Sequence, residues 1–156
     1  MATDTDTGMA TDMDMDTERN KRITIAVDFD GTIVQHEYPK IGKEKPFAIE
    51  TLLALQQEGF TLILWTARDG ELLEEALDWC RKRGLVFYAV NSNHPRGYLF
   101  QGQSDKSCKV IADIYIDDHN LGGLPDWDAI YSMISGMRRK KRPWWKRIFK
   151  KRSRKH

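Results

Sequence analysis

Short apolar runs alternate along most of the chain with segments whose apolar residues recur at helical spacing. The runs at 23–27 and 60–65 are mostly apolar and are typical of buried parallel strands. Between them, the apolar residues of segment 47–55 follow a helical period, with Pro46 placed for a first turn and Gly59 for a stop. The pattern therefore predicts a strand, a helix and a second strand, in that order.

The same alternation continues toward the C-terminus. Strands that alternate with helices favour a parallel sheet with right-handed crossovers. We therefore expect an α/β protein, a three-layer α/β/α sandwich with a mainly parallel, Rossmann-like sheet. The further elements predicted are a helix at 72–80, a strand at 85–90, a strand at 111–116, a helix from Pro125 or Asp126 to about Met137, and polar loops at 35–45 and 91–105.

The two ends of the chain differ from this body. Residues 1–21 hold too few aliphatic side chains to offset the entropy of ordering, which predicts disorder. Residues 22–137 form the predicted folded domain, and residues 138–156 form a basic, aromatic tail with twelve Lys or Arg and no acidic residue. Removing these twelve from the 25 basic residues of the chain leaves 13 against 23 acidic ones, so residues 1–137 carry a net charge of −10.

Composition predicts a cytoplasmic location. The apolar runs are too short to span a bilayer, and the acidic N-terminal segment lacks the apolar stretch of a secretory signal. Cys80 and Cys108 belong to no CxxC motif or Cys/His cluster, which disfavours a thiolate metal site.

The residues with the most reactive side chains directly follow the predicted strands. Ligands of parallel α/β sheets gather at the carboxyl ends of the strands, so we expect these residues to meet there. A carboxylate could attack phosphorus, a second could transfer protons, and a threonine could donate its hydroxyl and backbone N–H to a phosphoryl oxygen. An oxygen-rich site of this kind suits Mg²⁺. The residues concerned are Asp28, Asp30, Thr66, Arg68, Asp117 and Asp118.

Three segments resemble the motifs of the haloacid dehalogenase (HAD) superfamily of phosphohydrolases. The sequence Asp-Phe-Asp-Gly-Thr at 28–32 resembles the DxDGT motif. The apolar strand that ends in threonine at 62–66 resembles the second motif, and Ile-Asp-Asp at 116–118 resembles the acidic fourth motif. The resemblance spans residues 22–137 and implies an HAD-like fold.

The resemblance also implies a role for each motif residue. Asp28 would be the nucleophile and a Mg²⁺ ligand. Asp30 would be the general acid and base, and its backbone carbonyl would bind the metal. Thr66 would bind the phosphoryl group, and Asp117 would complete the metal site, with Asp118 as a further candidate. Because dehalogenases work without an acid two residues after the nucleophile, Asp30 favours phosphoryl chemistry.

Two basic positions are less clearly assigned. The lysine of the third motif is either Lys106 or Lys109, and Lys109 is favoured because it opens the segment that runs into the fourth strand. Arg68 is a candidate for phosphate binding, with a salt bridge to Asp69, Glu71 or another acid of the following helix as the alternative.

The spacing of the motifs leaves no room for a cap domain, so the resemblance is to small capless bacterial members of the superfamily. An open site could accept a macromolecular phosphate. A phosphorylated small molecule is slightly favoured, with the loop at 91–105 or the second subunit of a homo-oligomer as the cover.

The aromatic residues of the tail predict a partner for it. Two tryptophans precede Ile148 and Phe149 by four residues, so a helix in this segment would have an apolar side and, opposite it, a cationic side. This suits an anionic membrane, which would place the protein at the inner face of that membrane. Nucleic acid is the second candidate, because bases could stack on tryptophan, and a solvated tail that docks on the body is the third.

A rival hypothesis from another functional class follows from the tail. The chain would then be a catalytically weak, HAD-like binding or scaffold protein that the tail recruits to a membrane or to nucleic acid. The intact acidic and threonine positions of the three motifs argue against it, because a degenerate site would be expected to lose at least one.

Overall fold

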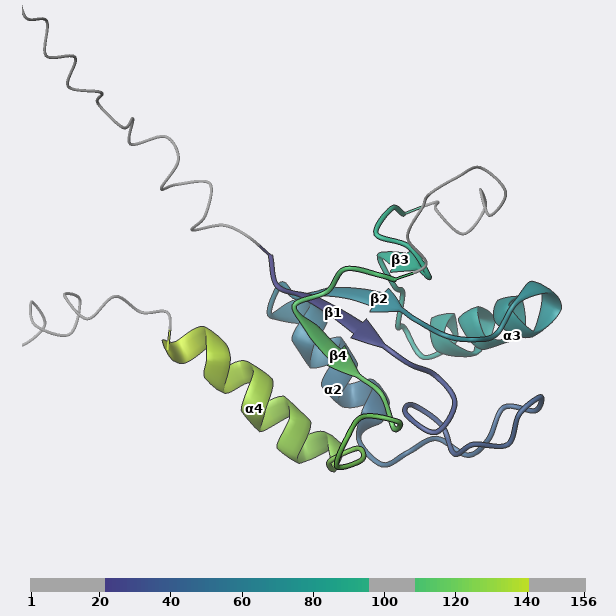
Figure 1. The fold of residues 1–156 in the computed structure, drawn as a ribbon, viewed down its shortest axis with the longest axis horizontal. Coiled ribbons are helices and arrows are strands. Elements are labelled where there is room, and N and C mark those ends of the chain that lie inside the picture. Colours follow the sequence, from purple (N-terminus) through teal and green to yellow (C-terminus); the bar gives the residue numbers. More distant parts are fainter. Residues whose placement is uncertain (1–21, 96–108, 141–156) are drawn as a thin grey trace, which may run out of the picture.

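The computed structural model describes residues 22–95 and 109–140, with side chains up to Met137. Strands and helices alternate through these residues, as the hydrophobic pattern predicts (Figure 1). The elements are β1 (Thr24–Val27), α2 (Ala48–Gln57), β2 (Thr61–Leu64), α3 (Gly70–Arg81), β3 (Ala89–Val90), β4 (Ile114–Ile116) and α4 (Trp127–Lys140).

The four strands form one parallel sheet in the order β3-β2-β1-β4. The central strand β1 pairs with β2 along its whole length and with β4 on its other side. Three residues of β1, Ile25, Ala26 and Val27, have no exposed surface, because neighbours cover both the edges and the faces of the strand. The predicted α/β class with a parallel, Rossmann-like sheet is confirmed.

The helices share one hydrophobic cluster with one face of the sheet. Ile25 and Val27 pack there with buried residues of α2, α3 and α4, whereas Ala26 and Ile63, which point the other way, belong to a second, smaller cluster. In Figure 1, α4 lies to the left and α3 to the right of the sheet. Within residues 22–95 and 109–140, the second face is therefore covered by strand-end and loop residues rather than by a helix, so these residues do not supply the third layer of the expected α/β/α sandwich.

Two strands are shorter than predicted. The predicted strand 85–90 is reduced to β3, because Leu85 is held in the core by a bond from its N–H to the Cys80 carbonyl at the end of α3, and only from Tyr88 does the chain reach β2. The predicted strand 111–116 is reduced to β4. Ile111 is 76% exposed and its backbone pairs with the side chain of Asn93.

The first helix begins one residue later than its apolar pattern suggests. Phe47 has a left-handed φ of 63° and a side chain that is 64% exposed, so it precedes α2 and does not join its buried face. Gly59 follows the helix with φ 85°, as expected of a glycine stop. At the other end of the chain, α4 continues to Lys140 and enters the segment predicted as the tail.

The segment after β1 folds back as a narrow loop. Val34 bridges antiparallel to Glu44, and the N–H of Gln35 donates to the Lys43 carbonyl. A Cβ on Gly42 would collide with the carbonyl of Gln35, which explains a glycine at this crossing. The predicted loop at 35–45 is thus ordered. Together with α2 and β2 it fills the interval between the first two motifs, where no cap domain was expected.

No helix within residues 22–95 and 109–140 combines the length and the apolar character that crossing a bilayer requires.

Candidate active site

Asp28 lies at the carboxyl end of the central strand. Its N–H donates to the Ile116 carbonyl at 3.0 Å, which fixes the end of β1 beside the end of β4. Its Oδ2 accepts a hydrogen bond of 3.1 Å from the hydroxyl of Thr32. Burial raises the pKa of Asp28 from 3.8 to about 6, and the negative charges of Asp117 and Asp118 act in the same direction. The hydrogen bonds from Phe29 and Thr32 oppose the rise.

Thr32 connects three parts of the fold. Its buried hydroxyl donates to Asp28 and accepts from the N–H of Asp118 at 3.0 Å, so it joins the ends of β1 and β4. Its carbonyl accepts from the indole N–H of Trp127 at 3.1 Å, which ties the same turn to α4. Sequence reasoning quoted Thr32 as part of a motif and gave it no role.

Asp117 and Asp118 follow β4 and form a compact acidic group with His119. Their ligand atoms lie within 4.8 Å of one another. His119 is 82% exposed, and its Nδ1 lies 3.0 Å from Asp118 Oδ1. Asp118 lies close to Asp28, because the Thr32 hydroxyl donates to the Asp28 carboxylate and accepts from the N–H of Asp118.

These carboxylates fit a hard divalent cation. Oxygen is the ligand atom that Mg²⁺ prefers, and three neighbouring carboxylates repel one another without a cation. Burial is the main cause of the raised pKa of Asp28, and repulsion from Asp117 and Asp118 adds to it. Asp28, Asp117 and Asp118 are therefore chemically suited to hold Mg²⁺.

Asp30 is engaged in a bidentate ion pair. The Nε and Nη2 atoms of Arg68 each lie 2.7 Å from one of its carboxylate oxygens. The Arg68 side chain has no exposed surface, and that of Asp30 is 12% exposed. Asp30 comes from the turn after β1 and Arg68 from the turn after β2, so the pair crosses between neighbouring strand ends.

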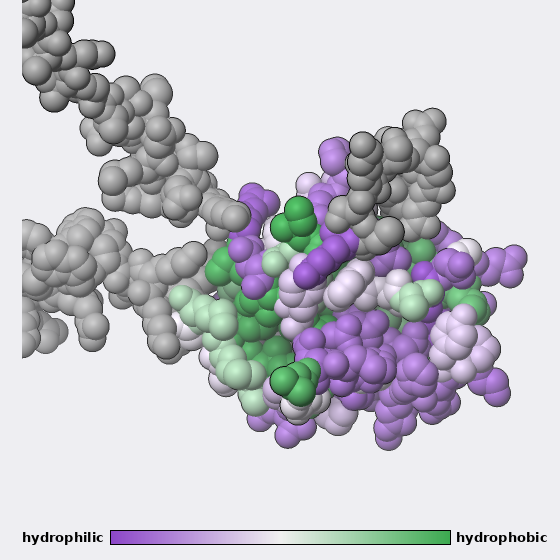
Figure 2. All heavy atoms as spheres, viewed as in Figure 1, coloured by the Kyte–Doolittle hydropathy of each residue, from purple (hydrophilic) through white to green (hydrophobic). Residues whose placement is uncertain are grey.

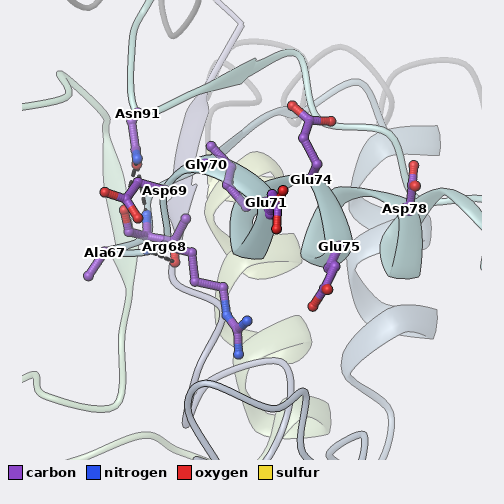
Figure 3. Close-up of a pocket in the computed structure, with 11 residues that line it drawn as sticks. Ala67, Arg68, Asp69, Gly70, Glu71, Glu74, Glu75, Asp78 and Asn91 are labelled. Carbon is purple, nitrogen blue, oxygen red and sulfur yellow. Dashed lines mark hydrogen bonds between the residues drawn. The ribbon is translucent and has the colours of Figure 1, made fainter.

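Arg68 does not form the contacts that the sequence suggested. Its guanidinium points away from Asp69 and Glu71, toward the loop below the helix (Figure 3). There it donates to the carbonyls of Pro39 at 3.0 Å and Lys40 at 2.9 Å. With its charge paired to Asp30 and its N–H groups used in this way, Arg68 is a poor candidate for direct phosphate binding, and the salt bridge predicted with a helix acid is wrong in its partner.

Thr66 is braced by Asn91. The Thr66 N–H donates to Asn91 Oδ1 and the Asn91 amide donates to the Thr66 carbonyl, both at 2.8 Å. The Thr66 hydroxyl oxygen accepts from the N–H of Arg68 at 3.2 Å. The backbone N–H that was expected to bind a phosphoryl oxygen is therefore occupied, and the hydroxyl is the donor that remains.

Lys109 is exposed and its ammonium lies 5.7 Å from the ring centroid of Tyr115. Lys106 lies outside the residues that the structure describes, so the choice between the two lysines stays a prediction. The basic tail beyond Lys140 lies outside them as well.

A cavity of about 790 Å³ adjoins Thr66 on the side of α3. Its wall includes Thr66, Arg68 and Asn91, and otherwise consists largely of acidic residues of the helix and the turn before it. The cavity does not include Asp28, so it lies beside the carboxylate group and does not contain it. Figure 2 shows hydrophilic side chains gathered over the right-hand part of the molecule, where Figure 1 places α3 and the loop after β1.

The predicted site residues thus come together in part. Asp28, Asp117 and Asp118 meet as expected, and Thr66 lies on the neighbouring strand end. Sequence reasoning missed the bracing roles of Asn91 and Thr32. A signal for Asn91 was present, since it follows a predicted strand and therefore lies at the same edge of the sheet.

No protein-family model matches the chain, and none of the curated proteins compared with it does. Among solved structures, a conserved protein coded by a locus of Bacteroides thetaiotaomicron is 59% identical and superposes with a TM-score of 0.67. The match covers 74% of this chain and 92% of that one. The chain therefore belongs to the same protein family as this conserved Bacteroides thetaiotaomicron protein.

Proposed function

We propose that the chain is a Mg²⁺-dependent phosphomonoester hydrolase of the HAD type that works through an aspartyl-phosphate. The observation that carries the proposal is the meeting of Asp28 with Asp117 and Asp118 at one edge of a parallel sheet. A partly buried carboxylate beside other negative charges lowers the stability of the fold. Carboxylates in such positions are therefore typical of functional sites.

In the proposed reaction, a carboxylate oxygen of Asp28 attacks phosphorus and the bond from phosphorus to the leaving oxygen breaks. The product of this step is an acyl-phosphate on Asp28. The hydrogen bond from Thr32 orients the carboxylate for this attack. Thr66, held by Asn91, would donate its hydroxyl proton to a phosphoryl oxygen.

Asp30 would transfer protons in both half-reactions. It would protonate the leaving oxygen in the first and accept a proton from the water that attacks phosphorus in the second. The second step releases inorganic phosphate and restores the Asp28 carboxylate. In the described structure both oxygens of Asp30 accept from Arg68.

Asp28, Asp117 and Asp118, with the backbone carbonyl of Asp30, would hold Mg²⁺. When bound, the ion would neutralise the charge that carboxylate and phosphate bring together.

The substrate that we favour is a phosphorylated small molecule. The acidic wall of the cavity beside Thr66 would repel the additional phosphates of a polyanion, which disfavours nucleic-acid ends at this site.

The direct test is hydrolysis of p-nitrophenyl phosphate with Mg²⁺ and with chelator. We expect turnover that needs Mg²⁺ and that falls by at least about 10³-fold in Asp28→Asn, which keeps the shape of the side chain and removes its nucleophilic charge. Turnover that survives the substitution or chelation would exclude this mechanism.

The same assay separates the proposal from the binding-protein hypothesis. A panel of phosphorylated metabolites should then identify the substrate. If neither the panel nor p-nitrophenyl phosphate is turned over while the protein still binds anionic vesicles, the scaffold role would be favoured instead.

A further inference from the structure

Arg68 is the largest side chain with essentially no exposure in the described part of the protein. Burying a guanidinium is unfavourable unless its charge is paired and its N–H groups have acceptors. Here the charge is paired with Asp30, and the carbonyls of Pro39 and Lys40 take two further N–H groups. The rings of Phe29 and Tyr38 lie 5.2 and 5.4 Å from the guanidinium carbon.

The ionic partner of Arg68 is the residue to which the proposed mechanism gives the proton transfers. A bidentate pair of this kind fixes both the position and the plane of a carboxylate, which a single lysine bond would not do. The backbone N–H of Arg68 also donates to the hydroxyl oxygen of Thr66 at 3.2 Å. One residue therefore contacts the proposed acid on one strand end and the proposed phosphate ligand on the next.

Arg68 also fixes the loop after β1. Its two carbonyl partners lie at the tip of the loop, whose base is closed by the bond from Gln35 to Lys43. A second arginine, Arg83, holds the same loop from the end of α3 through an ion pair of 2.8 Å with Glu44 and lies over the ring of Trp79. In the described part of the chain, the side chain of Arg83 forms hydrogen bonds with Glu44 and with the Trp79 carbonyl, and none with Asp30. Arg83 is therefore a control that contacts the loop without contacting the proposed acid.

We propose that Arg68 is a positioning residue that holds the Asp30 carboxyl in place for its proton transfers and fixes the loop at 38–40 through the carbonyls of Pro39 and Lys40. This inference rests on the proposed phosphohydrolase function. It assigns Arg68 no contact with the substrate. It replaces the phosphate-binding role that the sequence suggested for this residue.

The experiment compares Arg68→Lys and Arg68→Met on two classes of substrate. p-Nitrophenyl phosphate has a leaving group that needs little protonation, whereas an alkyl phosphate needs an acid. If Asp30 is misplaced, we expect kcat/KM, which reports the half-reaction that releases the leaving group, to fall by about 10²-fold on the alkyl phosphate and by about tenfold or less on p-nitrophenyl phosphate. The lysine variant should lie between wild type and Arg68→Met, because it keeps the charge and loses the bidentate geometry.

A double-mutant cycle tests whether Arg68 acts through Asp30. In an Asp30→Asn background, Arg68→Met should cost little further kcat, since the group it positions is already inactive. Arg83→Lys should leave the dependence on leaving group as in the wild type. Equal losses on both substrate classes, or full additivity with Asp30→Asn, would overturn the inference.

Hydrogen exchange provides a readout that does not depend on turnover. Arg68→Lys keeps the positive charge and can therefore be used even if Arg68→Met does not fold. It should speed amide exchange in residues 35–45 and leave exchange in the strands unchanged. Unchanged exchange in the loop would overturn that half of the inference even for an active enzyme. If the wild-type protein hydrolyses no phosphate ester, the proposed function is overturned, and with it the role of Arg68 in positioning Asp30. The exchange data would still decide whether Arg68 fixes the loop.

Discussion

The side-chain amide of Asn91 and the peptide of Thr66 form a reciprocal pair of hydrogen bonds, each 2.8 Å long. Asn91 reaches this position with a left-handed φ of 48°, a conformation that asparagine adopts more readily than most residues. The pair fixes the end of β2 to the end of β3 and holds the backbone of Thr66 in place. It thereby gives a residue from outside the three motifs a direct influence on the proposed phosphate site.

Replacing Asn91 by aspartate should therefore impair both stability and activity. Aspartate has the same shape as asparagine, but the nitrogen that donates to the Thr66 carbonyl is replaced by an oxygen, and two oxygen acceptors then face each other. We expect a loss of about 1–3 kcal/mol in the free energy of unfolding and a fall of about tenfold or more in kcat/KM. Chemical denaturation and phosphatase assays measure the two effects.

Asn93 offers a matched control for this prediction. It forms the same reciprocal pair with the backbone of Ile111, at 2.6 and 2.8 Å, in an exposed position. Asn93→Asp should lower stability and leave kcat/KM close to the wild-type value. Equal effects of the two substitutions on activity would show that Thr66 is not oriented by Asn91.

Gly31→Ala should disturb the metal site. Gly31 has φ +83°, and a Cβ there would collide with the carboxylate of Asp118. Gly122 has a similar φ of +92° with open space around it, so Gly122→Ala carries the backbone strain without the collision. We expect both alanine variants to lose about 1 kcal/mol or more of stability. Only Gly31→Ala should also weaken the rise in melting temperature with Mg²⁺, and a normal rise would contradict the assignment of Asp118.

Asp28→Asn should stabilise the metal-free protein at neutral pH. Because folding raises the pKa of Asp28 from 3.8 to about 6, the folded protein holds this proton more tightly than the unfolded chain. Wild-type stability therefore falls as pH rises from about 4 to 6, and the loss is complete above that range. Asp28→Asn removes this loss and should raise the free energy of unfolding at neutral pH by an amount on the order of 1 kcal/mol, once the partial exposure of Asp28 is allowed for.

Melting temperatures in chelator should thus be higher for Asp28→Asn than for wild type at pH 7.5 and equal near pH 4. Millimolar Mg²⁺ should reverse the order at pH 7.5, because it stabilises the protein that binds it. Asp126→Asn, at an exposed position, is the control and should change neither comparison. A wild type that is the more stable protein in chelator at pH 7.5 would speak against a cost of burying the Asp28 charge beside Asp117 and Asp118.

Cys80 should resist alkylation in the folded protein. It is fully buried in the main hydrophobic cluster, and burial raises the pKa of its thiol to about 12. The reactive thiolate is therefore scarce at pH 8. Mass spectrometry after iodoacetamide treatment should find the Cys80 peptide unmodified in native protein and modified after denaturation. Rapid labelling of the native protein would contradict the burial.

Removal of residues 141–156 should separate turnover from membrane binding. We expect truncation after Lys140 to leave the kcat for a small phosphate ester largely unchanged and to abolish binding to anionic vesicles at low salt. The cut falls at 140 because α4 continues to that residue. A full-length variant with serine at Trp144 and Trp145 keeps the charge and tests the aromatic contribution. Absence of vesicle binding by the intact chain would remove the membrane hypothesis.

Much of this fold follows from local sequence. Apolar runs followed by Asp28, Thr66 and Asp117 identify the strands and their approximate ends, because the buried part of a strand consists of apolar residues and the polar residues follow it. Their order along the chain then implies a parallel sheet whose carboxyl ends meet. The meeting of the three aspartates was predictable for this reason, and so were the loop, helix and strand that fill the interval between Thr32 and Thr66.

The tertiary structure decided the features that depend on partners distant in sequence. β3 is short because its length is set by where the chain reaches β2, and β4 because Asn93 pairs with the backbone of Ile111. The partner of Arg68 lies 38 residues away, and local spacing favours the nearer acids of the following helix. A buried guanidinium pairs with whichever carboxylate the packed core brings within reach, and packing geometry cannot be deduced from spacing along the chain.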